Sequence, residues 1–91
     1  MIKQTQTPQR RAGYRLEAIE DEVLLFHPGQ TRILYCNQTA SLIWQLCDGE
    51  RTVQEITALL TEAYPDAASD IAQDIESTLQ MLEDHGAITL D

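Results

Sequence analysis

The chain has 91 residues, and 43% of them are hydrophobic, which is enough for one small domain with a single core. Fifteen acidic against six basic side chains give a net charge of −9, and no lysine or arginine follows Arg51; nucleic acids and acidic membrane surfaces, which are bound through cations, are therefore disfavoured as partners. Apolar runs stay well short of the roughly 18 residues that cross a bilayer, and the first residues lack a signal-peptide hydrophobic region, so we expect a cytoplasmic protein.

The N-terminal part of the chain is predicted to hold a tail and three strands. Residues 1–13 are rich in Gln, Thr and Arg, and we expect them to form a flexible tail before a domain over residues 14–91. Alternating or β-forming runs predict strands over 14–19, 23–26 and 31–36. Short turns join these strands, so an antiparallel meander is the simplest arrangement.

The remainder of the chain is predicted to be helical. Helices are expected over 38–47, 53–63 and 68–84, and a short final strand over 88–90. Three strands followed by three helices form an α+β pattern, and short, closely linked helices resemble a winged-helix bundle. The expected fold class is therefore α+β and winged-helix-like, with an N-terminal three-stranded antiparallel β-sheet followed by a three-helix bundle.

The ends of the predicted helices carry local signals. Asn37 can cap the first helix, because a short side-chain oxygen there accepts from free amides of the opening turn. Thr52 and Glu55 have the Thr-x-x-Glu spacing of a capping box. Gly49 and Gly86 can supply the left-handed residue that closes a helix. The helix bounds are therefore predicted from the residues that flank them.

Few residues could carry catalysis or hold a metal. His27 lies in a Pro-Gly turn and His85 at a helix end, and neither has a Cys, Asp or Glu at a recognised ligand spacing. Cys36 and Cys47 lack the second pair that a metal cluster needs; they are interpreted as buried thiols, with a disulfide as the alternative. No Gly-rich loop follows a strand, and no nucleophile–base pair is evident. We therefore expect no enzymatic activity, no metal and no cofactor.

The third predicted strand has apolar side chains on both faces. Ile33 and Tyr35 lie on one face, and Leu34 and Cys36 lie on the other. Three helices cover one face of a small sheet more easily than two, which leaves apolar surface or an open sheet edge for something to occupy. The N-terminal tail or a partner in a homodimer could instead cover the second face.

An ordered set of residues resembles the signature of the PqqD-like family. It contains the two short helices joined by an Asp-Gly corner and continues along the third helix. The matching positions are Asn37, Thr39, Ala40, Ile43, Trp44, Leu46, Asp48, Gly49, Thr52, Glu55, Ile56, Tyr64, Asp74, Ile75, Leu79, Leu82 and Gly86. The similarity covers about residues 14–90; Cys36 departs from it, because the family more often has Leu before the Asn.

The resemblance implies recognition of a leader peptide. Family members bind the leader of a ribosomally made precursor peptide and present it to a modifying enzyme, often a radical S-adenosylmethionine protein. The leader is expected to add as a strand to the edge of the third strand and to rest its side chains against the third helix. The expected peptide-binding residues are Thr31, Arg32, Ile33, Leu34, Tyr35 and Cys36 on the strand and Asp70, Ile71, Asp74, Ile75 and Thr78 on the helix.

Two points about this expected site stay open in the sequence. Ile71 and Ile75 also suit the core, so the helix face that lines the groove is not determined. The carboxylates of Asp70 and Asp74 predict that the leader brings Lys, Arg or backbone donors near them.

Three other functions compete with leader recognition. A DNA-binding winged helix is disfavoured by an acidic third helix with no Lys or Arg, and a small enzyme by the absence of a catalytic set. A scaffold or dimerisation module of winged-helix fold, which binds a protein rather than a leader peptide, is the main alternative.

Overall fold

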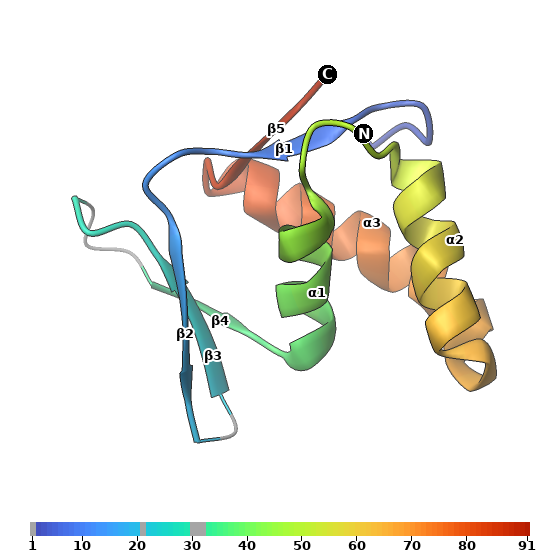
Figure 1. The fold of residues 1–91 in the computed structure, drawn as a ribbon, viewed down its shortest axis with the longest axis horizontal. Helices are drawn as coiled ribbons and strands as arrows, with labels where there is room; N and C mark the ends of the chain where they lie inside the picture. Colours follow the sequence, from blue (N-terminus) through green and yellow to red (C-terminus); the bar gives the residue numbers. More distant parts are fainter. Residues whose placement is uncertain (1, 21, 30–32) are drawn as a thin grey trace.

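The computed structural model describes residues 2–20, 22–29 and 33–91, and within them the expected α+β order is confirmed. A three-stranded antiparallel sheet is followed by three helices (Figure 1). The sheet consists of β2 (Arg15–Ile19), β3 (Glu22–Phe26) and β4 (Ile33–Cys36). The helical elements are α1 (Gln38–Leu46), α2 (Val53–Ala63), the 3₁₀ turn η1 (Pro65–Ala67) and α3 (Ala68–Asp84). Two further short strands, β1 (Pro8–Arg10) and β5 (Ile88–Leu90), form a separate two-stranded sheet.

Strand β3 lies in the middle of the three-stranded sheet. It pairs antiparallel with β2 on one side and with β4 on the other, and residues paired across strands share a face. Leu16, Leu25 and Leu34 are aligned in this way on the inner face. Leu25 is fully buried, and the other two are half-buried against the core. The inner face of the sheet therefore packs against the helices.

The caps expected at the starts of α1 and α2 and at the end of α3 are present, whereas the C-cap of α1 is Cys47 and the N–H of Gly49 donates to the Pro8 carbonyl. The Asn37 side-chain oxygen accepts a hydrogen bond of 2.8 Å from the Ala40 N–H at the start of α1. Thr52 and Glu55 form the reciprocal capping box of α2, with hydrogen bonds of 3.0 and 3.1 Å. Gly86 follows α3 with a φ of 75°. Residues other than glycine adopt this left-handed backbone conformation only at a cost in free energy. Local chemistry thus sets the helix bounds close to those predicted.

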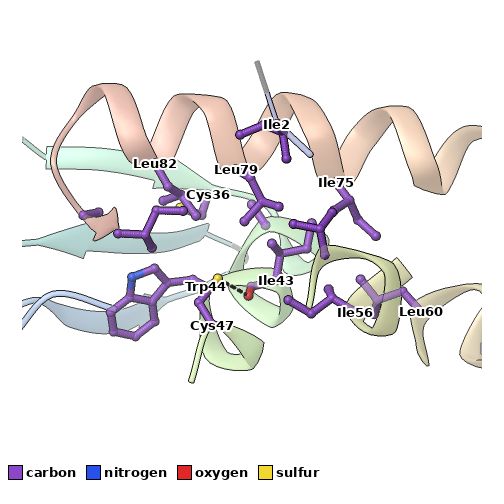
Figure 2. Packing of buried hydrophobic residues seen from close by; sticks show 14 of the residues in the cluster. Ile2, Cys36, Ile43, Trp44, Cys47, Ile56, Leu60, Ile75, Leu79 and Leu82 are labelled. Carbon is purple, nitrogen blue, oxygen red and sulfur yellow. Dashed lines mark hydrogen bonds between the residues drawn. The ribbon is translucent and has the colours of Figure 1, made fainter. Parts of the chain in front are cut away.

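One cluster of buried apolar side chains joins the sheet to the helices (Figure 2). Helix α3 contributes a stripe of four side chains at helical spacing, Ile71, Ile75, Leu79 and Leu82, all with 4% exposure or less. The remainder of the cluster consists of Ile2, Leu25, Cys36, Ala40, Ile43, Trp44, Cys47, Val53, Ile56, Leu60, Ala87 and Ile88. Because Cys36 of β4 and the α3 stripe belong to one core, the core fixes the edge strand relative to the helix bundle.

The first residues differ from the expectation of a tail separate from the domain. Strand β1 pairs antiparallel with β5. The backbone N–H groups of Gly49 and Val53 donate to the carbonyls of Pro8 and Gln6, each at 2.9 Å. The side chain of Ile2 is only 8% exposed and lies in the core cluster. The segment is therefore tied to the domain by main-chain hydrogen bonds. Because such bonds do not depend on the type of side chain, the polar sequence of this segment has no periodic pattern that predicts them.

Candidate functional site

Strand β4 lies at one edge of the three-stranded sheet and pairs with β3 alone. Along the described part of the chain, no strand pairs with its other edge. An edge strand presents unpaired N–H and C=O groups that can template another strand. The predicted site residues Thr31 and Arg32 lie outside the described residues, so the described part of the open edge is Ile33–Cys36.

The two faces of β4 differ in burial, as their alternation predicts. Cys36 is buried and Leu34 half-buried, on the inner face that packs against the core. Ile33 and Tyr35 point to the outer face and are 51% and 71% exposed. A strand added beside β4 would therefore have one row of side chains near the core and another near an exposed apolar pair.

Helix α3 exposes only part of its predicted peptide-binding face. Ile71 and Ile75 are 4% and 0% exposed and belong to the apolar stripe that packs in the core. Their role in contacting a peptide stays a prediction. Asp70 and Asp74 are exposed and Thr78 is half-buried; the three follow one another at a spacing of four, so they share one flank of the helix. A role of this flank in peptide binding stays a prediction.

The outer face of β3, which was not predicted from the sequence, is also part of this surface. Leu24 is paired with Tyr35, and Phe26 with Ile33, so each pair shares the outer face. Leu24 and Phe26 are half-buried. The run Val23–Phe26 is apolar at every position, and only the strand register shows which two of its side chains face outward.

Acidic side chains outnumber basic ones on the described surfaces of the β2–β3 hairpin and α3. The hairpin exposes Glu17, Glu20 and Glu22 together with one cation, Arg15. Helix α3 exposes Asp70 and Asp74 in the half of the helix that lies next to α2 (Figure 1). A basic side chain near the N-terminus is engaged elsewhere: the guanidinium of Arg10 lies 5.4 Å from the ring centroid of Trp44. The net negative charge of these surfaces favours a ligand that is neutral or positively charged.

Two shallow hollows open elsewhere on the surface. The larger, of about 510 Å³, lies between the end of the β2–β3 hairpin and the start of α1. It is lined by Ala18, Glu20, Glu22, Val23, Asn37, Gln38 and Thr39. The smaller, of about 390 Å³, lies on α3 and is lined by Gln73, Glu76, Ser77 and Gln80. Neither lining includes a described residue of β4.

The cysteines are free and buried rather than bridged. Burial raises the pKa of Cys47 to about 12, and its Sγ–H donates to the Ile43 carbonyl at 3.1 Å. A thiol so protonated is a poor nucleophile. Among the described residues, no three His, Cys, Asp or Glu side chains are grouped to hold a metal ion, and no described helix has the length and hydropathy to span a bilayer.

Comparison with known proteins gives a family match and close relatives. Residues 22–88 match the family model described as Coenzyme PQQ synthesis protein D (PqqD). A PqqA binding protein from Pseudomonas fluorescens (strain Pf0-1) is 36% identical over 90 residues, which cover 96% of this chain and 94% of the relative. Another, from Klebsiella pneumoniae (strain 342), is 38% identical over 74 residues, covering 78% of this chain and 76% of the relative.

A solved structure supports the fold. The structure of TbiB1 in complex with the TbiA(beta) leader peptide matches with a TM-score of 0.69, covering 88% of this chain and 93% of that one. The two sequences are 20% identical over the match. At this identity the likeness shows a shared fold.

Proposed function

We propose a function from one premise: the chain belongs to the PqqD family. Its relatives are named as PqqA binding proteins, and the chain is accordingly a binding protein and not an enzyme. We infer that it is a stand-alone recognition element in the cytoplasm, which binds the leader region of a ribosomally synthesised precursor peptide. It presents the leader to a separate modifying enzyme, for which the family resemblance implies the radical S-adenosylmethionine class.

The open edge of β4 is the observation that carries this proposal. A leader in extended conformation can pair its main chain with Ile33–Cys36 and extend the sheet from three strands to four. Main-chain hydrogen bonds then supply affinity, and alternate side chains supply specificity. The edge is held in place because Cys36 is anchored in the core, while Tyr35 beside it stays exposed.

The charges on α3 support a basic or neutral leader. Asp70 and Asp74 are exposed on the same flank of the helix. No lysine or arginine lies on α3 to neutralise them. We propose that this flank faces the bound leader, whose Lys, Arg or backbone donors meet these carboxylates.

An NMR titration tests the proposal directly. The ¹⁵N-labelled protein is titrated with synthetic leader peptides copied from the short precursor genes that flank its own gene. We expect the largest shift changes in the amides of Ile33–Cys36 and α3, with saturation in the micromolar range or tighter, about −8 kcal/mol or better. No shift with any of these peptides would remove leader recognition as the function.

Main-chain pairing is tested with N-methylated peptides. Two versions of the bound peptide carry N-methyl groups on alternate residues, in opposite phase, so that their side chains are unchanged. Because only every second N–H of an added strand faces β4, one phase should abolish binding and the other should weaken it far less. Equal binding of both versions and the unmodified peptide would exclude strand addition.

The charge on α3 is tested with a matched pair of variants. Asp74→Lys and Glu76→Lys change the net charge by the same amount, and both positions are exposed on α3. The two side chains lie on different sides of the helix, because they are two residues apart. We expect Asp74→Lys to weaken binding of a basic leader about three- to tenfold and Glu76→Lys to have a smaller effect. Equal effects would mean that only net charge matters.

The scaffold alternative predicts a different result. A scaffold or dimerisation module would bind a large protein partner or a second copy of itself and ignore short peptides. Light scattering on the purified chain, alone and with the enzyme encoded nearby, separates a homodimer from a leader-dependent complex.

A further inference from the structure

Exposed apolar side chains gather on the outer face of the three-stranded sheet. Among the described residues, five large hydrophobic side chains are exposed, and three of them, Ile19, Ile33 and Tyr35, point outward from this sheet. The helices pack on its inner face, so the outer face is covered by no described element. Neither packing in the core nor main-chain pairing at the open edge explains these exposed apolar side chains.

The strand register organises the outer face into two rows. One row runs through Arg15, Phe26 and Ile33, and the other through Glu17, Leu24 and Tyr35. Each row begins with a charged side chain on β2, passes a half-buried apolar side chain on β3, and ends with an exposed apolar side chain on β4. Both rows therefore become apolar toward the open edge.

A strand added at β4 would extend both rows by one residue each. Neighbouring strands lie about 4.8 Å apart, and directly opposite residues have Cβ atoms about 5 Å apart. One ligand residue would thus lie opposite Ile33 and another, two positions away, opposite Tyr35. Both of these ligand side chains point outward, away from the core and from α3.

The composition of β4 is unusual for an unprotected edge. Edge strands are generally blunted with lysine, proline or other charged side chains. The described residues of β4 are Ile, Leu, Tyr and Cys, and none of them protects the edge. An apolar edge of this kind favours pairing with a partner strand whose side chains are also apolar.

The position of the charges favours a single peptide strand as the occupant. A flat protein surface laid over the whole outer face would cover Arg15, Glu17 and Glu22 and would have to desolvate them. A strand beside β4 meets Ile33 and Tyr35 and leaves those charges in water. The same acidic surroundings favour a peptide with no net negative charge.

We propose that Ile33 and Tyr35 are specificity-determining residues that select the outward side chains of the bound peptide. The ligand class is an extended, neutral or basic peptide with large aliphatic or aromatic side chains at positions i and i+2 on its outward face. This proposal rests on the strand addition proposed above and adds a second recognition surface to it, on the face opposite the helices.

The test uses threonine substitutions on both edges of the sheet. Ile33→Thr and Tyr35→Thr remove the apolar surface and keep the preference for a strand. Ile19→Thr is the matched control, because Ile19 is 53% exposed on the same face but lies on β2, at the far edge. Affinity for a fluorescein-labelled leader peptide from the flanking precursor genes is measured by anisotropy, and thermal unfolding confirms that each variant is folded.

We expect Ile33→Thr and Tyr35→Thr each to weaken binding about three- to tenfold, and Ile19→Thr to leave it unchanged. Replacing the two outward residues of the peptide by Ser should weaken its binding to the unmodified protein. With the Tyr35→Thr variant, the same peptide change should have a smaller additional effect, since the partner side chain is already gone.

Failure of this inference is distinguishable from failure of the proposed function. If the N-methylated peptides lose binding in one phase but Tyr35→Thr and Ile33→Thr bind normally, strand addition stands and outward selection is refuted. If Ile19→Thr weakens binding as much as Tyr35→Thr, a larger body covers the face and the single-strand occupant is wrong. If neither N-methylated peptide differs from the unmodified one, strand addition and outward selection both fail.

Discussion

Replacing Ile2 by alanine tests whether the first residues are part of the folded domain. Ile2 is 8% exposed and lies in the core cluster (Figure 2), although it belongs to the segment, residues 1–13, that was expected to be flexible. Burial of each CH₂ group stabilises a protein by about 0.8 kcal/mol, and Ile→Ala substitutions in cores cost about 2–5 kcal/mol. A site near a chain end can relax around the lost atoms, so we expect Ile2→Ala to lower the free energy of unfolding by about 2 kcal/mol.

Urea denaturation followed by tryptophan fluorescence measures this change. Trp44 is the single tryptophan of the chain and is 8% exposed, so its emission reports loss of the core. For a domain of this size, about 2 kcal/mol corresponds to a fall in Tm of roughly 8–16 °C. Thr5→Ala, an exposed position in the same segment, is the control and should stay within about 0.5 kcal/mol. An Ile2→Ala variant as stable as this control would refute the packed N-terminal segment and restore the flexible tail.

Two titrating side chains give further predictions. Hydrogen bonds from the backbone N–H groups of Glu50 and Arg51 hold the pKa of Asp48 below its ordinary value, and Arg51 also pairs with this carboxylate. The resulting stabilisation is present above the carboxyl's pKa in the unfolded chain, about 4, and is lost as the pH falls through the lower pKa of the folded state. The stability of Asp48→Asn should therefore approach that of the unmodified protein in acid, and a difference independent of pH in urea titrations would contradict this. Cys47, whose pKa is raised to about 12 by burial, should be thiolate in only about one molecule in ten thousand at pH 8. We expect iodoacetamide to modify Cys47 at the rate of unfolding, and rapid native-state labelling by mass spectrometry would show that the thiol is accessible.

Most of the helical structure could be predicted because its determinants are local. The capping box of Thr52 and Glu55 starts α2 where it was expected, and Asn37 starts α1. The alternation of β4 likewise predicted that Tyr35 faces away from Cys36. These signals act over a few residues, so no knowledge of the fold is needed to interpret them.

The candidate site could be predicted only in part. Ile71 and Ile75 lie on α3 beside the row of Asp70, Asp74 and Thr78, which is exposed or half-buried, at neighbouring positions around the helix. Helical spacing alone cannot decide which neighbouring row turns inward, because that depends on where the other elements pack. The two outward rows of the sheet could not be predicted for a similar reason, since they form only when the register of the three strands is set.

By itself the sequence determined the order and bounds of the helices, the two faces of the edge strand, the acidic surface and the family. Tertiary structure alone decided that Ile71 and Ile75 belong to the core and that residues near Pro8 pair with residues near Leu90. The physical reason is how far apart in the chain the interacting residues are. Caps, alternation and charge act between close neighbours in the chain, whereas burial and main-chain pairing between distant segments depend on how the whole chain is packed.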